Sequence, residues 1–124
     1  MDCYAFLKSL VDQDTSAVVI CDTDHKIVYM NPAACQRYAQ YGGAALLGKS
    51  LLHCHNGKSG ELIKRVLDWF AVSPTNNRVH TFYNEKENKD VYMVALRDEK
   101  GALIGYYEKH AYRNRDMTPF YELT

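Results

Sequence analysis

The spacing of apolar residues changes along this chain of 124 residues. In residues 4–12, YAFLKSLVD, apolar side chains recur every three or four positions, which is the period of an α-helix. Residues 60–72, GELIKRVLDWFAV, repeat that period with an apolar stripe of Leu62, Ile63, Val66, Leu67 and Phe70. Later runs are rich in β-branched and aromatic residues, which predicts strands over residues 78–84, 90–96 and 103–112.

Turn and capping residues divide the segment between the two helical stretches. The runs SAVVICD (16–22) and KIVYM (26–30) are β-rich and joined by a polar turn, so they predict a hairpin. Asn31-Pro32 then begins a helix over residues 32–41, because Asn is a good N-cap and Pro suits the first helical position. Short helical turns follow, and Ser59 is the predicted N-cap of the helix over residues 60–72.

The predicted order is helix, two strands, several helices and three strands. This order favours one α+β domain, an antiparallel sheet with helices on one face. We expect an N-terminal helix or cap over residues 1–14, the domain itself over 15–114 and a C-terminal tail over 115–124. Gly105, inside the last predicted strand, indicates a bulge or a close approach of another backbone.

Composition excludes several classes of function. Fifteen basic residues balance fifteen acidic ones, so charge gives no reason to expect binding to nucleic acid or to an anionic membrane. No apolar run approaches the roughly 18–20 residues that span a bilayer, and the N-terminus does not resemble a signal peptide. The four cysteines form no CxxC pair, so we expect reduced thiols and a cytoplasmic location.

Four local motifs resemble those of the PAS family in the right order. VVICDTDHKIVYMNPAACQRY resembles the PAS opening, in which an Asp-containing turn joins two strands and an Asn begins the first core helix; Asp22 and Asn31 occupy those positions. LLGKSLLHCHN resembles the Leu-Leu-Gly-Lys-Ser segment after that helix, and LRDEKGALIGYYE resembles the last hairpin. The resemblance covers residues 16–112 and implies a PAS fold: a five-stranded antiparallel sheet with short helices and one longer helix on one face, plus the N-terminal helix.

The resemblance implies a sensory domain that binds a small ligand between sheet and helices. We do not expect an enzyme, because the sequence holds no Ser-His-Asp elbow, phosphate loop or paired-carboxylate motif. Many PAS domains bind heme, flavin or metabolites, and others act only as dimerisation modules. Photoactive flavin domains carry a Gly-Arg/Lys-Asn-Cys-Arg-Phe-Leu-Gln motif, and here Leu51 stands at the position of its reactive cysteine. We therefore do not expect a flavin photoadduct.

The triplet His53-Cys54-His55 is the most distinctive chemical feature of the sequence. Neighbouring residues point in different directions, so the three side chains do not suit one zinc ion, and no second ligand pair lies nearby. The same argument disfavours an activated cysteine, because a catalytic pair must face each other in space. An ordinary polar turn before a helix remains an alternative.

Heme needs a single axial histidine beside an apolar pocket. The prediction places His55 on the iron, with His53 and Cys54 as neighbours. The predicted pocket wall comprises Leu62, Val66, Phe70, Met93 and Tyr92, and Met93 or His80 is a candidate second ligand. If the domain does not bind heme, we expect it to bind another small apolar molecule or no ligand at all.

Signalling is predicted to pass through a homodimer or a partner protein. Alternation places Tyr92, Val94 and Leu96 on one face of a strand and Val91, Met93 and Ala95 on the other, so both faces are apolar. An apolar outer face needs a cover, and the helix over residues 4–12 is predicted to supply it, within the chain or across a dimer. A cofactor-free dimerisation or adaptor module is the alternative function.

Overall fold

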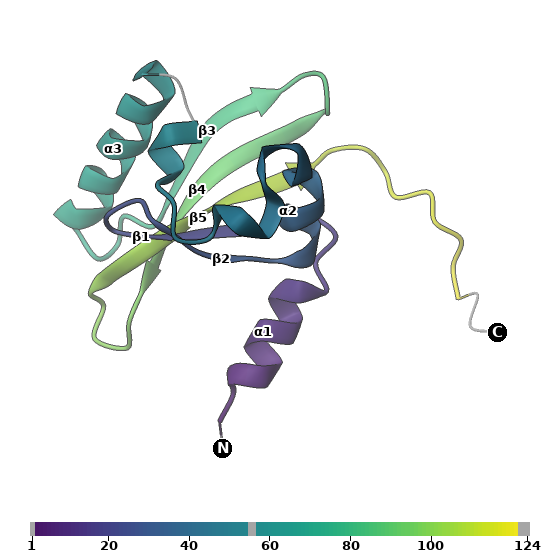
Figure 1. The fold of residues 1–124 in the computed structure, drawn as a ribbon, viewed down its shortest axis with the longest axis horizontal. Helices are drawn as coiled ribbons and strands as arrows, with labels where there is room; N and C mark the ends of the chain where they lie inside the picture. Colours follow the sequence, from purple (N-terminus) through teal and green to yellow (C-terminus); the bar gives the residue numbers. More distant parts are fainter. Residues whose placement is uncertain (1, 55–56, 122–124) are drawn as a thin grey trace.

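The computed structural model describes residues 2–54 and 57–121. Five antiparallel strands form one sheet in the order β2-β1-β5-β4-β3 (Figure 1). The strands are β1 (Val19–Asp22), β2 (Ile27–Met30), β3 (Arg78–Asn84), β4 (Lys89–Arg97) and β5 (Leu103–Tyr112). The predicted sheet is confirmed, and β3 and β5 have the predicted bounds.

A layer of helices lies on one side of this sheet (Figure 1). It contains α2 (Pro32–Arg37), α3 (Gly57–Val72) and the short 3-10 helices η1 (Ala39–Tyr41), η2 (Gly43–Leu46) and η3 (Leu51–Cys54). The N-terminal helix α1 (Tyr4–Asp12) projects away from this layer. Among the described helices, none is long and apolar enough to cross a membrane.

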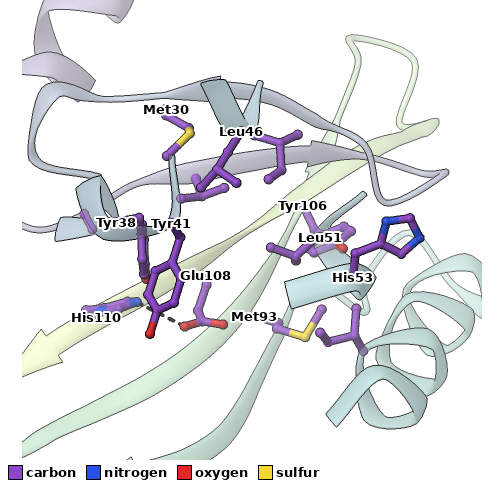
Figure 2. A pocket seen from close by; sticks show the side chains of 14 residues that line it. Met30, Tyr38, Tyr41, Leu46, Leu51, His53, Met93, Tyr106, Glu108 and His110 are labelled. Carbon is purple, nitrogen blue, oxygen red and sulfur yellow. Dashed lines mark hydrogen bonds and ion pairs between the residues drawn. The ribbon is translucent and has the colours of Figure 1, made fainter. Parts of the chain in front are cut away.

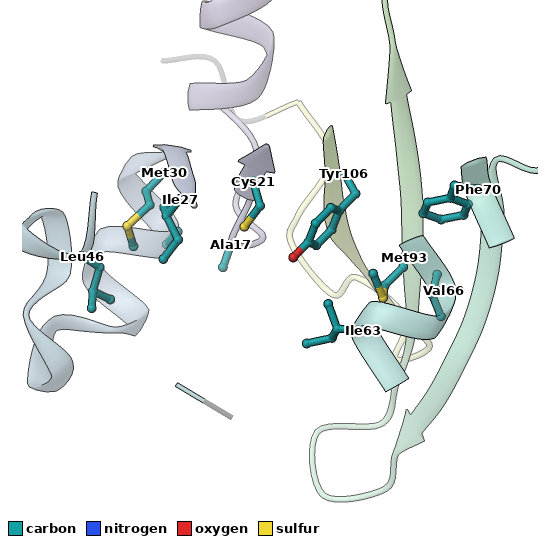
Figure 3. Close-up of a cluster of buried hydrophobic side chains, with 11 residues drawn as sticks. Ala17, Cys21, Ile27, Met30, Leu46, Ile63, Val66, Phe70, Met93 and Tyr106 are labelled. Carbon is teal, nitrogen blue, oxygen red and sulfur yellow. The ribbon is translucent and has the colours of Figure 1, made fainter. Parts of the chain in front are cut away.

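The hydrophobic core fills the space between the sheet and the helical layer (Figure 3). From the sheet it takes inward-facing side chains such as Cys21, Met93 and Tyr106, which lie on three neighbouring strands. From α3 it takes Ile63, Val66 and Phe70, which are spaced at the helical period. The core therefore fixes the helical layer over the strands that surround the site described below.

Two aspartates form the turns that the sequence motifs indicated. The Asp22 carboxylate accepts hydrogen bonds from the backbone N–H groups of Asp24 (2.9 Å) and Lys26 (3.0 Å). The Asp98 carboxylate accepts from those of Lys100 (2.9 Å) and Ala102 (3.0 Å). Such Asx-type turns replace backbone hydrogen bonds where the chain reverses, which explains why an Asp begins each hairpin turn.

Gly105 allows strands β1 and β5 to approach closely. A Cβ atom added at this position would collide with the backbone carbonyl oxygen of Cys21 on the neighbouring strand. The predicted close approach is therefore confirmed, and any other residue at Gly105 would push the two strands apart.

Asn31 joins three segments of the chain and has no exposed surface. Its Oδ1 accepts from the backbone N–H of Ala34 (2.9 Å), which confirms the predicted N-cap of α2, and from that of Val18 (2.9 Å). Its Nδ2 donates to the carbonyls of Val11 (3.0 Å), Asp14 (3.3 Å) and Ser16 (3.0 Å). One side chain thus caps α2 and fixes the segment that leads out of α1.

The N-terminal helix does not cover its own sheet. None of its residues is buried, and Leu10 is 73% exposed. Its second half borders the outer face of the sheet: Leu10 and Val11 lie beside Ile20, Leu96 and Tyr107, and Asp12 accepts a hydrogen bond from the Tyr29 hydroxyl on β2. A cover within the chain is therefore wrong, and a cover across a dimer stays a prediction.

Several other local expectations are corrected by the structure. Helix α3 begins at Gly57, so Ser59 lies within its first turn and is not its N-cap. Helix α2 ends at Arg37, earlier than predicted, because the chain tightens into η1 before Gly42 and Gly43, both at positive φ. Leu62, predicted to face the core, is 43% exposed, because the buried stripe of α3 comprises Ile63, Val66 and Phe70.

Candidate functional site

A cavity of about 560 Å³ lies between the sheet and the helical layer (Figure 2). This volume is within the range of about 300 to 1,000 Å³ that is usual for small-molecule sites. Most of the wall is apolar and comes from both layers. The lining residues are Ala17, Val19, Ile27, Met30, Tyr38, Tyr41, Leu46, Leu51, His53, Ile63, Met93, Tyr106, Glu108 and His110.

The predicted site residues are only partly brought together at this cavity. His53 and Met93 line it. Val66 and Phe70 are buried in the core beneath α3 and are not among the lining residues, and Leu62 faces outward. The side chain of Cys54 and the whole of His55 lie outside the described residues.

Two sheet residues that were candidates for the pocket lie on the opposite face. Alternation along β4 places Tyr92 away from Met93, and the Tyr92 ring stacks on the His80 ring with centroids 4.7 Å apart. His80 Nε2 lies 3.1 Å from a carboxylate oxygen of Asp90, which is also on the outer side. Tyr92 is therefore not pocket wall, and His80 is not placed to ligate a group in the cavity.

One end of the cavity is polar and is built on β5. Glu108 and His110 are two residues apart on this strand, so both point to the helical side. His110 Nε2 lies 3.1 Å from Glu108 Oε1, and His110 Nδ1 lies 2.8 Å from Lys89 Nζ. Because an ammonium group only donates, Nδ1 accepts and the ring proton on Nε2 is donated to Glu108. This chain of hydrogen bonds engages both ring nitrogens of His110, with Nδ1 facing Lys89 and Nε2 facing Glu108.

The Lys89 side chain is 2% exposed, and its charge is compensated behind the cavity wall. Its Nζ lies 3.2 Å from Glu87 Oε2. Glu87 also accepts two hydrogen bonds from the Arg37 guanidinium, at 2.9 and 2.7 Å. These bonds, those from Arg37 first, lower the pKa of Glu87 to about 2, so the carboxylate stays ionised beside its two cations.

A second polar pair joins Tyr106, which lines the cavity, to His25, which is not among the lining residues. The Tyr106 hydroxyl and His25 Nδ1 are 2.9 Å apart. Burial raises the pKa of Tyr106 above its usual value and lowers the pKa of His25. Both groups are therefore held neutral, and the Tyr106 hydroxyl has its hydrogen-bond partner within the protein.

Of the candidate heme ligands, Met93 lines the cavity, whereas the described histidines near it are not placed as ready axial ligands. Both ring nitrogens of His110 are engaged, by Lys89 and Glu108, and His25 Nδ1 faces Tyr106. In Figure 2 the His53 ring points away from the other labelled side chains. Within the described part of the chain, no group of three or more His, Cys, Asp or Glu side chains is placed to hold a metal ion. Heme stays a prediction that depends on His55 or on a rotated His53.

Sequence reasoning missed the polar end of the cavity. Tyr38 and Tyr41 follow α2, whereas Glu108 and His110 are on the last strand, so nothing in their local spacing links them. The period-two alternation of β5 offered one signal, because it places Glu108 and His110 on the same face as the buried Tyr106. The role of Lys89 had no local signal, since a lysine at the edge of a turn is usually solvated.

Comparison with known proteins identifies the fold. A family model described as "PAS fold" matches residues 11–110. No curated protein matches the chain. A C-terminal domain from Streptococcus mutans is similar with a TM-score of 0.64 and 20% identity, covering 95% of this chain and 87% of that one.

Two further solved structures are similar at comparable levels. The Aer2 receptor of Vibrio cholerae, described as a dual PAS-heme oxygen sensor, has a TM-score of 0.57 and 19% identity over 77% of this chain and 91% of that one. The PAS domain of BvgS from Bordetella pertussis has a TM-score of 0.60 and 15% identity over 93% of this chain and 89% of that one. At these identities the likeness concerns the fold alone.

Proposed function

Because this chain belongs to the PAS family, we propose that it is a sensory domain that binds a small organic molecule in the cavity between its sheet and its helices. The observation that carries this proposal is the cavity itself. A volume of about 560 Å³ with a mostly apolar wall and a few converging polar groups is typical of a ligand site. Solved relatives described as sensors, among them a heme oxygen sensor and a sensor histidine kinase, support a role in signalling.

The contacts of α2 offer a route from the cavity to α1. Tyr38 and Tyr41, at the end of α2 and in η1, line the cavity. Asn31 at the start of α2 holds the carbonyls of Val11 and Asp14 at the end of α1. A ligand that prefers one position of the tyrosines would bias the position of α2, and Asn31 would pass that bias to α1.

A matched pair of leucine variants tests whether the cavity is the binding site. Leu51→Trp fills the cavity, whereas Leu62→Trp adds the same bulk on the exposed side of α3. Native mass spectrometry and an absorption spectrum of each purified protein would report any retained molecule. We expect Leu51→Trp to lose it and Leu62→Trp to keep it, with circular dichroism confirming that both fold. Equal retention in both variants would contradict the proposal.

The same absorption spectrum tests heme. A Soret band that disappears in His55→Ala but not in His53→Ala would support the predicted axial ligand. A band that survives both substitutions would remove these two histidines from that role. A colourless protein that retains an organic molecule by mass would favour the cavity ligand over heme.

A cofactor-free dimerisation module is the second candidate function, and the exposure of α1 favours it. The apolar side chains Tyr4, Phe6, Leu7 and Leu10 are between 60% and 73% exposed. An amphipathic helix with nothing on its apolar face invites a partner, and a second copy of this chain supplies the same apolar stripe. The outer face of the sheet beside it is also apolar, at Ile20, Leu96 and Tyr107.

The oligomeric state tests this second function. Leu7→Asp with Leu10→Asp would convert the dimer to a monomer in light scattering after size exclusion. Ser9→Asp, on the opposite side of α1, would leave the dimer intact. A protein that is monomeric before any substitution would contradict this function.

A further inference from the structure

We infer that the cavity selects a ligand with an apolar body and a positively charged amine group, which binds at Glu108 near Tyr38 and Tyr41; this inference rests on the proposed function. Figure 2 shows these three side chains gathered at one end of the cavity, with Met93 and Leu51 further along it. The polar end of the cavity would therefore hold the amine group, and its apolar part would hold the apolar body of the same molecule.

The carboxylate of Glu108 has hydrogen-bonding capacity left over. Its side chain is 38% exposed and lines the cavity. Within the described part of the chain, this carboxylate accepts a hydrogen bond from His110 Nε2. A carboxylate can accept about four hydrogen bonds, so acceptor positions remain for a donor inside the cavity.

The charges around the cavity favour a cation over an anion. The cationic groups of this region, Lys89 and Arg37, face Glu87 behind the wall and are absent from the lining. Among the described residues that line the cavity, Glu108 is the acidic one, and no Lys or Arg lies among them. An anionic ligand head would be brought next to the Glu108 carboxylate and repelled, whereas an ammonium would form a charge-assisted hydrogen bond with it.

The tyrosines complete a site for an ammonium group. Aromatic faces attract cations through the negative charge above the ring. Burial, followed by the charge of Glu108, raises the pKa of Tyr38, so its ring stays a neutral phenol beside the carboxylate. Tyr41 is 66% exposed, which places it where the cavity meets solvent. A carboxylate with two aromatic rings near it at one end of a cavity recognises an amine better than it recognises an alcohol.

The inference is tested with three probes that share one apolar body: phenylpropylamine, phenylpropanol and phenylpropionate. Binding of each probe to the intact chain is measured by isothermal titration calorimetry. We expect the amine to bind about tenfold more tightly than the alcohol, because of the charge-assisted bond, and the acid to bind least. Glu108→Gln should remove the preference for the amine and leave the affinity for the alcohol unchanged.

The probes and variants distinguish two outcomes: the cavity binds ligands but not amines in particular, or the cavity binds none of the probes. Gln at position 108 keeps an oxygen that accepts from His110, so the hydrogen-bond chain and the fold are retained. Glu99→Gln, in the exposed turn between β4 and β5, is the matched control and should preserve the preference. An alcohol or acid that binds as tightly as the amine would overturn the amine site but keep the cavity function. The cavity function itself is contradicted if all three probes fail to bind.

Discussion

Helices α1 and α3 have similar amphipathic sequences, but they differ in how much of their apolar face is buried. Helix α3 buries Ile63, Val66 and Phe70 against the sheet, whereas α1 buries none of its residues. Helix α3 is continuous with the core, and α1 is held at its C-terminal end by Asn31. An apolar stripe at helical spacing therefore shows that a helix needs a partner, but it does not show whether the same chain supplies that partner.

Truncating one apolar residue in each helix gives the largest expected contrast. Phe70→Ala removes a fully buried ring between α3 and the sheet and should lower the free energy of unfolding by about 3–5 kcal/mol. Leu10→Ala removes a side chain that is exposed in the single chain and should change it by less than about 0.5 kcal/mol. Urea unfolding at low protein concentration, where the chain is monomeric, measures both values. Similar losses in the two variants would show that α1 is packed within the chain after all.

The anchor of α1 gives the next largest effect. Asn31→Ala leaves buried backbone groups without their partner at both α2 and the end of α1, so we expect a loss of about 2–3 kcal/mol in urea unfolding. Asn31→Asp keeps the oxygens that accept from Ala34 and Val18 but loses the donors to the α1 side.

The two Asn31 variants therefore distinguish the two helices. In hydrogen exchange, Asn31→Asp should expose the amides of residues 4–12 while those of α2 stay protected, and Asn31→Ala should expose both. Equal exposure of α2 in the two variants would show that the α2 cap and the α1 anchor are not separate functions of this side chain.

The sequence predicted the sheet, the turns and the family because these depend on local signals. Period-two alternation, the Asp turns at Asp22 and Asp98, and the cap at Asn31 are all properties of a few neighbouring residues. The site was harder to predict because its polar end combines residues about seventy positions apart, such as Tyr38 and Glu108. The packing of α1 could not be predicted either, since its stripe is as regular as that of α3.

The C-terminal end of α3 has an anchor of its own, at Arg97. The Arg97 guanidinium donates to the carbonyls of Phe70 (2.7 Å) and Ser73 (3.1 Å), and its Nε donates to Asn77 Oδ1 (2.7 Å). These bonds satisfy carbonyls that a helix end leaves without partners. Arg97→Lys keeps the charge but cannot form the same fork, so we expect a loss of about 1 kcal/mol in thermal or urea unfolding.

The matched control for Arg97 is Arg65→Lys, an exposed position on α3. It should leave stability unchanged within about 0.5 kcal/mol. If both lysine variants lose the same stability, the geometry of the Arg97 fork contributes nothing, and α3 is held by its apolar side chains alone.

The smallest expected effect concerns pH and the attachment of α1 to β2. Asp12 accepts hydrogen bonds from Lys8 and from the Tyr29 hydroxyl, and these bonds, that from Lys8 first, lower its pKa. A carboxyl whose pKa is lower in the folded state contributes its full stability above the unfolded pKa, near 3.8, and loses that contribution as pH falls through the lower pKa of the folded state. We therefore expect the amide resonances of residues 8–12 to shift in NMR spectra as the solution is acidified from pH 5 to about pH 2. Asp12→Asn should abolish this dependence, and Asp68→Asn on α3 should leave it unchanged. If the resonances of Asp12→Asn move with pH as those of the unmodified chain do, another group loosens α1, and the link through Tyr29 is not its acid-sensitive contact.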